Sequence, residues 1–89
     1  MMDEKIKQEV IVYVDAKYNK ISQRLAKKFK QLTDRDIYIC CMLLADFNTG
    51  MIATILNIQS DSVNIHRSRL RKKLNLETDQ NLIEHLQNL

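Results

Sequence analysis

The residues best suited to chemistry lie in one segment, residues 59–74, with the sequence QSDSVNIHRSRLRKKL. At about 100° per residue, a helix over this segment would separate apolar residues from short polar ones. The inner side would hold Val63, Arg67, Leu70 and Leu74 with His66 at its edge, and the outer side would hold Asp61, Asn64, Ser68 and Lys72, flanked by Ile65 and Arg71. Short polar side chains can bind base edges in a DNA major groove, and the cations that follow can bind phosphates. The segment therefore predicts a helix that reads DNA; the alternative is an amphipathic surface helix with a solvated basic end.

The net charge of +3 is distributed unevenly along the chain. Residues 59–75 carry five Lys and Arg against one Asp, whereas residues 76–89 carry three acids and no Lys or Arg. Residues 17–30 hold six cations and no acid, namely Lys17, Lys20, Arg24, Lys27, Lys28 and Lys30. We expect this basic block to lie beside the 59–74 helix and to extend a surface for nucleic acid. The alternative is that these charges are solvated helix faces, which is the usual role of such runs.

The sequence gives little support for an enzyme, a disulfide framework or a metal site. Cys40 and Cys41 are adjacent and are the only cysteines, so they have the spacing of neither a zinc site nor a disulfide framework, and we expect both in the core. His66 and His85 belong to no metal-ligand motif. Cys40 and His66 could be imagined as nucleophile and base, but the chain has no Gly-rich phosphate loop and no nucleophile elbow. We expect no enzyme activity, no cofactor and no metal site.

The elements that must position the 59–74 helix are all predicted to be helical. The chain has one glycine and no proline, too few for strands joined by tight turns, and its apolar residues recur every three or four positions. Thr33 and Asn48 are good N-caps, Asp36 can complete a capping box with Thr33, and Asn57 suits the left-handed residue that ends a helix. The prediction is an all-α helix-turn-helix bundle of four short helices at about 34–46, 49–56, 60–74 and 79–88, the last capped by Thr78 or Asp79.

A long N-terminal amphipathic helix is predicted in front of this bundle, over residues 4–31. Its apolar residues form one stripe with steps of three and four: Ile6, Val10, Val14, Tyr18, Ile21, Leu25, Phe29 and Leu32. We expect this helix to dock on the bundle; the alternatives are pairing with a copy of itself or continuing a linker from upstream. The chain would then divide into an N-terminal amphipathic helix or linker, 1–31, and a DNA-binding domain, 32–89.

Residues 32–76 resemble the LuxR-type helix-turn-helix, the DNA-binding output module of response regulators and quorum-sensing activators. The matching pieces are LTDRD at 32–36, IATIL at 52–56, SVNIH at 62–66 and KKL at 72–74, with no gap needed between them. The chain departs from the family at three positions, with Asn64 in place of the usual Lys, Met51 in place of Glu and Asp46 in place of Gly. The resemblance implies four helices, the third in the major groove and the fourth often a dimer contact. It also suggests that this chain is the C-terminal part of a larger regulator.

The resemblance carries specific roles over to matching positions. Those that face bases in the family are Asn64, Ile65 and Ser68 here. Those that face the DNA backbone are Asn48, Thr49, Ser62, Arg71 and Lys72 here. The apolar residues of the last helix, Leu82, Ile83, Leu86 and Leu89, are either core or a homodimer contact. We expect Asn64, in place of the usual Lys, to change which DNA sequence is bound more than whether DNA is bound. Asn can still contact a base, because its amide pairs with adenine N6 and N7.

The predicted function is sequence-specific binding of double-stranded DNA as the output domain of a transcriptional regulator. The alternative is a helical protein-interaction module that uses the N-terminal stripe and the last helix. No apolar run approaches the roughly 18 residues of a membrane span, and the N-terminus lacks the pattern of a secretory signal. We therefore expect a cytoplasmic homodimer with no membrane contact and no small-molecule ligand.

Overall fold

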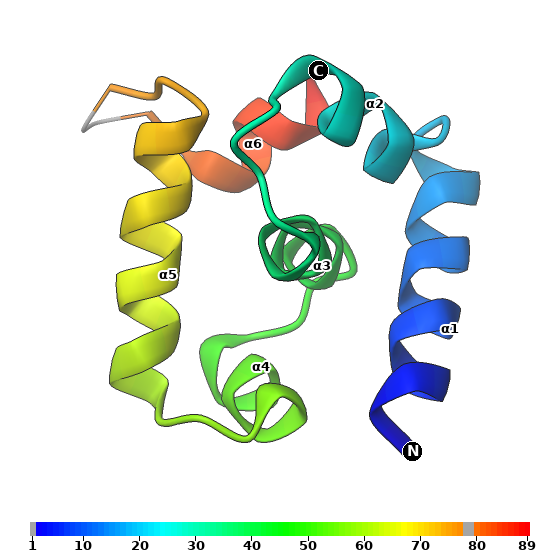
Figure 1. Ribbon diagram of the computed structural model, residues 1–89, viewed down its shortest axis with the longest axis vertical. Helices are drawn as coiled ribbons and strands as arrows, with labels where there is room; N and C mark the ends of the chain where they lie inside the picture. Colours follow the sequence, from blue (N-terminus) through cyan, green and yellow to red (C-terminus); the bar gives the residue numbers. More distant parts are fainter. Residues whose placement is uncertain (1, 78–79) are drawn as a thin grey trace.

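A computed structural model describes residues 2–77 and 80–89 of the chain, which form six helices and no strand (Figure 1). The helices are α1 (Met2–Lys17), α2 (Ile21–Lys28), α3 (Asp34–Leu44), α4 (Thr49–Leu56), α5 (Ser60–Lys73) and α6 (Leu82–Gln87). The predicted all-α helix-turn-helix bundle is confirmed, with α3 to α5 close to their expected bounds. Among the described residues, no helix combines the length and the apolar character needed to cross a membrane.

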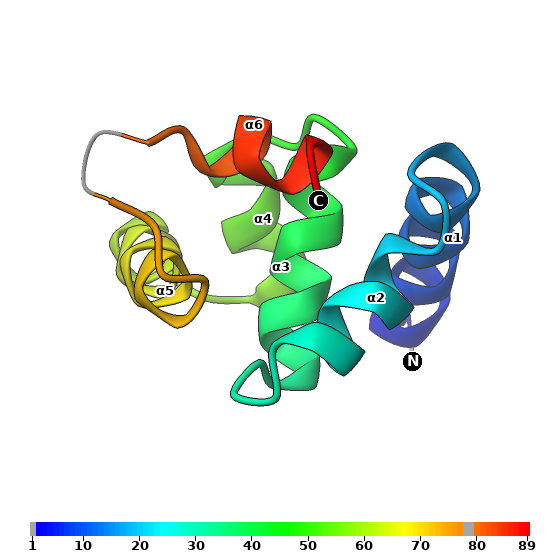
Figure 2. The same cartoon turned by 90° about the horizontal axis from the view of Figure 1, so that it is seen from above.

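The helix α3 lies at the centre of the molecule. α1, α2 and α6 pack directly against it, and α5 stands on the side opposite α1 (Figures 1 and 2). The sequence predicted burial on one side of this helix, through Ile37, Cys40, Cys41 and Leu44. In fact every residue from Tyr38 to Leu44 is buried, and Ile37 is only partly so. The prediction underestimated the burial because neighbours cover α3 on several sides.

Both cysteines are core residues, as expected. Cys40 and Cys41 are free thiols buried within α3. Burial raises the pKa of both thiols far above the usual value, to about 12 at Cys41. A thiol held protonated in this way is a poor nucleophile, since the thiolate is the reactive form.

The ends of α3 follow from local sequence. The Thr33 hydroxyl accepts a hydrogen bond from the Asp36 amide at 3.1 Å, and the Asp36 carboxylate accepts one from the Thr33 amide at 2.9 Å, which completes the predicted capping box. After α3 the chain turns at Asp46, whose φ of 66° is left-handed. This is the position where the LuxR-type family usually has glycine. Asp tolerates the conformation better than most residues, so the substitution is compatible with the turn.

The predicted N-terminal helix over 4–31 is wrong in one respect, because it is broken into α1 and α2. Asn19 and Lys20 have φ values of 54° and 59°, so the backbone is left-handed at both. The Asp15 carboxylate holds this break by accepting hydrogen bonds from the Ser22 amide at 2.8 Å and the Ser22 hydroxyl at 2.5 Å. Polar side chains on both sides of the junction thus replace the helical hydrogen bonds that are lost there.

The break keeps the N-terminal segment within the length of the molecule. A straight helix over 28 residues would be about 42 Å long at 1.5 Å per residue, whereas the longest extent of the whole molecule is 34 Å. The bend turns α2 back onto α3. Val10 and Val14 on α1, and Ile21 and Leu25 on α2, are all buried in the common core. The apolar stripe therefore docks on the bundle, as expected.

The connection between α4 and α5 is a tight turn of three residues, 57–59. Asn57 ends α4 with φ 57° and ψ 48°, which is the predicted left-handed conformation. The Ile58 amide then donates to the Ala53 carbonyl at 3.0 Å, and the Ile58 side chain packs against the core. Gln59 occupies the N-cap position of α5 without a side-chain hydrogen bond. The relative orientation of α4 and α5 is thus fixed by backbone conformation and packing.

The last helix is shorter than expected. α6 begins at Leu82, and the Asn81 side chain caps it by accepting a hydrogen bond from the Glu84 amide at 2.9 Å. The predicted caps, Thr78 and Asp79, lie outside the described residues. α6 packs on α3 through Leu82 and Leu86.

An ion pair joins α3 to the end of α5. Lys73 Nζ lies 2.6 Å from Asp36 Oδ2. Burial disfavours the charged form of Asp36, but hydrogen bonds from Lys73 and from the Thr33 backbone outweigh this effect and hold the pKa of the carboxyl below its ordinary value. The Asp36 carboxylate therefore serves both as part of the α3 cap and as the anchor for α5.

Replacing Asp36 with Asn should lower the free energy of unfolding at pH 7 by about 1.5–3 kcal/mol, since a charge-assisted hydrogen bond is lost. A group with a depressed folded pKa stabilises the protein above its unfolded pKa, and that stability is lost as pH falls through the folded value. The difference between wild type and D36N in urea unfolding should therefore shrink as the pH falls below the ordinary carboxyl pKa and through the lowered folded pKa of Asp36. The matched control is D34N, an exposed acid in the same turn, for which the loss should stay under about 1 kcal/mol. A pH-independent D36N effect would contradict the assignment.

Replacing Asn57 with Ala should destabilise the fold by about 1 kcal/mol, because an ordinary L-residue is strained in the left-handed region. Replacing it with Gly should cost nothing or stabilise slightly, since glycine adopts this conformation freely. Thermal unfolding of both variants measures the difference. Equal melting temperatures for N57A and N57G would show that the turn does not depend on this backbone conformation.

Candidate nucleic-acid interface

The α4–turn–α5 unit presents one face of α5 to solvent at the edge of the molecule (Figures 1 and 2). The inner side of α5 holds Val63, Leu70 and, just past its end, Leu74, all buried in the core. The small Ala53 on α4 belongs to the same core, where its size allows two helices to approach closely. α4 and α5 pack directly on each other. Both helices therefore act as one support for the outer face.

The outer face of α5 has the composition predicted from its spacing. Asn64, Ser68 and Lys72 are exposed, and the Ile65 side chain is 51% exposed beside them. A single exposed aliphatic residue is ordinary on a protein surface, and this one lies next to the exposed polar residues of the same helix. The structure thus brings the three predicted base-contact residues, Asn64, Ile65 and Ser68, together on one accessible surface.

The predicted backbone-contact residues fall into two groups. Asn48 is exposed, and its side-chain oxygen caps α4 by accepting a hydrogen bond from the Met51 amide at 2.8 Å. Thr49 and Ser62 are partly buried near the starts of α4 and α5. All three lie at helix N-termini, where the dipole favours a negative group such as phosphate.

The cationic end of α5 is not a uniform set of phosphate ligands. Lys72 is exposed, but Lys73 pairs with Asp36, and Arg71 Nη2 donates to the Glu77 carbonyl at 2.8 Å. Arg71 has a guanidinium group with five N–H donors. Its hydrogen bond to the segment after α5 gives it a structural role that the basic run in the sequence did not reveal.

Sequence reasoning assigned no role to Arg69. This residue is exposed on α5, one helical turn beyond Ile65 on the same flank. The spacing of four residues between Ile65 and Arg69 places both on one side of a helix, so this position could have been identified from the sequence.

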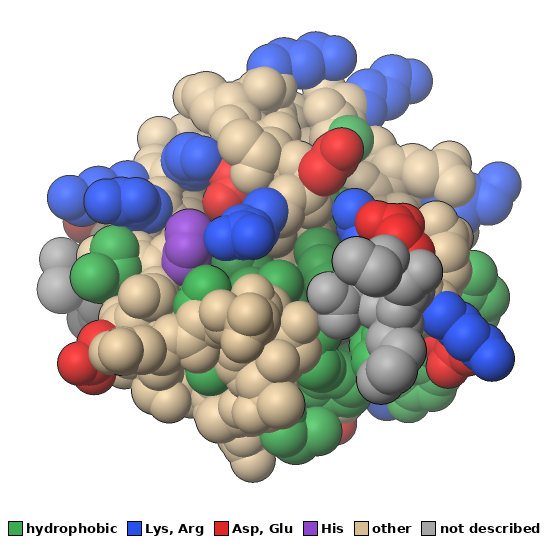
Figure 3. Space-filling view, turned by 60° about the horizontal axis from the view of Figure 1, so that its bottom comes forward, with side chains coloured by type: hydrophobic (Ala, Val, Ile, Leu, Met, Phe, Trp, Pro, Cys, Tyr) green, Lys and Arg blue, Asp and Glu red, His purple; other side chains and the backbone are tan. Residues whose placement is uncertain are grey.

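The basic block over residues 17–30 does not extend this surface, contrary to expectation. α2 and the end of α1 carry most of it, and α3 lies between them and α5 (Figures 1 and 2). Viewed from the α4 end, uncharged side chains cover the middle of the face, and most Lys and Arg side chains stand towards its margins (Figure 3). The two cationic segments thus lie on different sides of α3, because α2 packs on the side of α3 nearer α1.

The apolar residues of the last helix have mostly a core role. Leu82 and Leu86 are only 2% and 1% exposed, so they offer no surface to a second copy in this conformation. Ile83 and Leu89 are partly buried and keep some accessible surface. Elsewhere, the large apolar side chains of Val12 and Tyr13 on α1 are 65% and 54% exposed.

Comparison with known proteins supports the interpretation of the α4–turn–α5 unit. The family described as "Bacterial regulatory proteins, luxR family" matches residues 30–86, more than half of the chain and including α3 to α6 almost entirely. Searches of curated proteins and of solved structures found no match. Because the match covers the whole helix-turn-helix and its supporting helices, the chain belongs to the luxR family of bacterial regulatory proteins and carries its DNA-binding helix-turn-helix domain.

Proposed function

We propose that this protein binds double-stranded DNA in a sequence-specific manner, with α5 in the major groove, as the output domain of a transcriptional regulator. The observation that carries the proposal is the outer face of α5, where Asn64, Ile65 and Ser68 are all exposed on a helix whose inner side is fixed in the core. Exposed short polar residues allow close approach of the helix to the base edges. The DNA-binding unit is residues 32–89, and residues 1–31 supply α1 and α2 as additional packing elements.

Base contacts come from Asn64, Ile65 and Ser68 on the outer face of α5. Asn64 lies one turn into the helix, where the N-terminal part of a reading helix meets the bases. Its amide can pair with adenine N6 and N7, and Ile65 offers an apolar contact for a thymine methyl group. Ser68 follows one turn later and can donate to or accept from a base edge.

Backbone contacts surround this surface. Asn48, Thr49 and Ser62 bind one phosphate region from the two helix N-termini. Arg71 and Lys72 bind phosphates at the other end of α5, with Lys72 the more accessible of the two. The exposed Arg69 adds a third cation on the flank of Ile65.

The alternative, a helical protein-interaction module, loses most of its proposed surface. The N-terminal stripe and the leucines of α6 on which it depended are largely buried in the core of this chain. Val12 and Tyr13 remain exposed, but they lie outside that stripe.

The two roles assigned to α5 can be separated by one binding experiment. A duplex selected from a random library and a scrambled duplex are titrated with wild type, N64A and K72A over a range of salt concentrations. N64A should cost about 1–3 kcal/mol on the selected duplex and much less on the scrambled one. K72A should weaken binding to both duplexes similarly and lower the salt slope by about 1.

The matched control for charge is K5A, which removes an exposed cation from α1, far from α5 along the fold. It should leave both affinities and the salt slope near wild type. Equal losses on both duplexes for N64A would reassign Asn64 to the DNA backbone. A wild-type protein that binds neither duplex would overturn the proposed function itself.

We also propose that the protein dimerises on DNA, since one reading helix covers few base pairs and two half-sites are usually needed. Ile83 and Leu89, which keep accessible surface, are the residues of the predicted dimer contact still available to a second copy. Sedimentation of the chain alone should show weak self-association, strengthened by a duplex with two half-sites and reduced by I83S. Equally tight binding to an isolated half-site would argue against a dimer.

A further inference from the structure

The outer face of α5 carries one acidic side chain, Asp61, in the first turn of the helix. Asp61 is the only Asp or Glu between Asp46 and Glu77, a stretch that includes both helices of the helix-turn-helix and five Lys and Arg. Its side chain is exposed. At about 100° per residue, Asp61 lies within about 40° of Ile65 and Ser68 around the helix axis. A carboxylate thus stands in the middle of the face that carries the proposed base contacts.

No side chain of the described residues forms a hydrogen bond or an ion pair with the Asp61 carboxylate. The positions one helical turn further along α5 hold Asn64 and Ile65, neither of which is a cation. At the other end of the helix, Lys73 is paired with Asp36. The Asp61 carboxylate is therefore open to a hydrogen-bond donor from another molecule.

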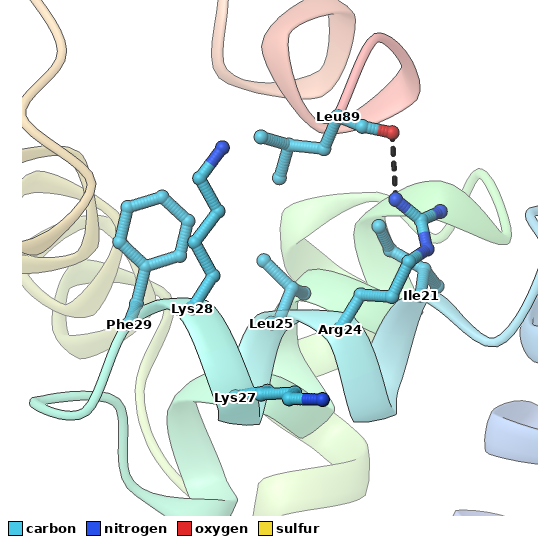
Figure 4. Close-up of a pocket in the computed structure, with 7 residues that line it drawn as sticks. All are labelled: Ile21, Arg24, Leu25, Lys27, Lys28, Phe29 and Leu89. Atoms are coloured by element: carbon cyan, nitrogen blue, oxygen red, sulfur yellow. Dashed lines mark hydrogen bonds between the residues drawn. The ribbon is translucent and has the colours of Figure 1, made fainter.

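The cations of residues 17–30 do not supply that donor either, because α3 stands between α2 and α5 (Figures 1 and 2). The Arg24 guanidinium donates to the main-chain oxygen of Tyr18 at 2.6 Å, within its own part of the fold. Figure 4 shows Lys28 extending from α2 towards Leu89 and Lys27 extending away from it. Both lysines thus remain on the α2 side of the molecule.

An ionised carboxylate offers hydrogen-bond acceptors and no donor. In a major groove it is repelled by the phosphates and by every acceptor on a base edge. Guanine presents the acceptors N7 and O6, thymine presents O4, and adenine presents its amino group beside the acceptor N7. Cytosine presents the N4 amino group, which is a donor. A carboxylate on a reading helix therefore favours cytosine at the base that it faces.

We propose that Asp61 is a specificity-determining residue that accepts a hydrogen bond from the N4 amino group of one cytosine in the bound site. The N-terminal part of a reading helix is the part that meets base edges, and Asp61 lies in its first turn. The inference rests on the proposed binding of DNA by α5, and it adds a fourth base contact to those of Asn64, Ile65 and Ser68. The dipole of α5 also favours an acid at this position, but that effect is independent of the DNA sequence.

The test compares wild type and D61N on the selected duplex, on a set of duplexes in which each base pair is replaced in turn, and on a scrambled duplex. Wild type should prefer cytosine at one position by about 5- to 150-fold. D61N replaces one acceptor oxygen with an amino donor, so it should lose this preference and keep those at the other positions. It should also bind the scrambled duplex about two- to fivefold more tightly at low salt, because a charge of the same sign as the phosphates is removed.

The matched control is E9Q, which removes an exposed acid from α1, on the side of α3 opposite α5. It should leave the base preferences and the affinity for the scrambled duplex unchanged. Asp61 is exposed, so D61N should fold normally, and a thermal melt verifies this.

Two results would contradict the inference alone, with wild type binding the selected duplex as proposed. One is a D61N variant whose base preferences match those of wild type at every position. The other is a preference lost in D61N at a position where wild type favours a base other than cytosine. A wild type that binds none of the duplexes would instead contradict the proposed function, and the role of Asp61 with it.

Discussion

The rest of the structure depends on the burial of α3 from Tyr38 to Leu44. Seven consecutive residues, Tyr38–Leu44, are removed from solvent, and a helix that is apolar all round is stable only when neighbours cover it on every side. α6 and the α4–α5 pair leave one side of α3 uncovered. α1 and α2 cover that side with Val10, Val14, Ile21 and Leu25. In a chain of 89 residues, where surface is large relative to volume, this additional layer gives a fuller core than the family's helices alone would provide.

Polar interactions then orient the layers around α3. Asp36 connects the start of α3 to Lys73 at the end of α5, so α5 is tied to the core at its C-terminal end. Its N-terminal end is set by the turn at Asn57. On the far side, Arg24 ties the α1–α2 junction to Leu89. Each of these residues joins segments that packing alone would hold less specifically.

Local features of the fold could be predicted from the sequence, and non-local ones could not. The caps at Thr33 and Asn48, the left-handed Asn57 and the two sides of α5 depend on residues within a few positions of each other, so spacing and residue type were sufficient. The break at Asn19–Lys20 could not be predicted, because the apolar stripe continues through it and the chain there contains no glycine or proline.

Interactions between distant residues account for the other differences. The Lys73–Asp36 pair spans 37 residues, and nothing near Lys73 distinguishes it from Lys72. The burial of Leu82 and Leu86 depends on where α6 crosses α3. For the candidate site, the sequence predicted which side chains share the outer face of α5, but the separation of the 17–30 cations from that face depends on the direction of α2.

The exposed face of α5 also has a consequence for the entropy of binding. The backbone of α5 is already ordered by the Asn57 turn, by packing on α4 and by the Lys73–Asp36 pair. Binding of a ligand therefore carries no further entropic cost for ordering this helix. The remaining entropic cost of binding is the loss of rotamer freedom in the side chains. Asn64 and Ser68 have few rotatable bonds and lose little, whereas the long Lys72 loses more. In the proposed complex with DNA, short residues at the centre of the face and a long one at its end would thus place the greatest loss of side-chain freedom at the backbone contacts.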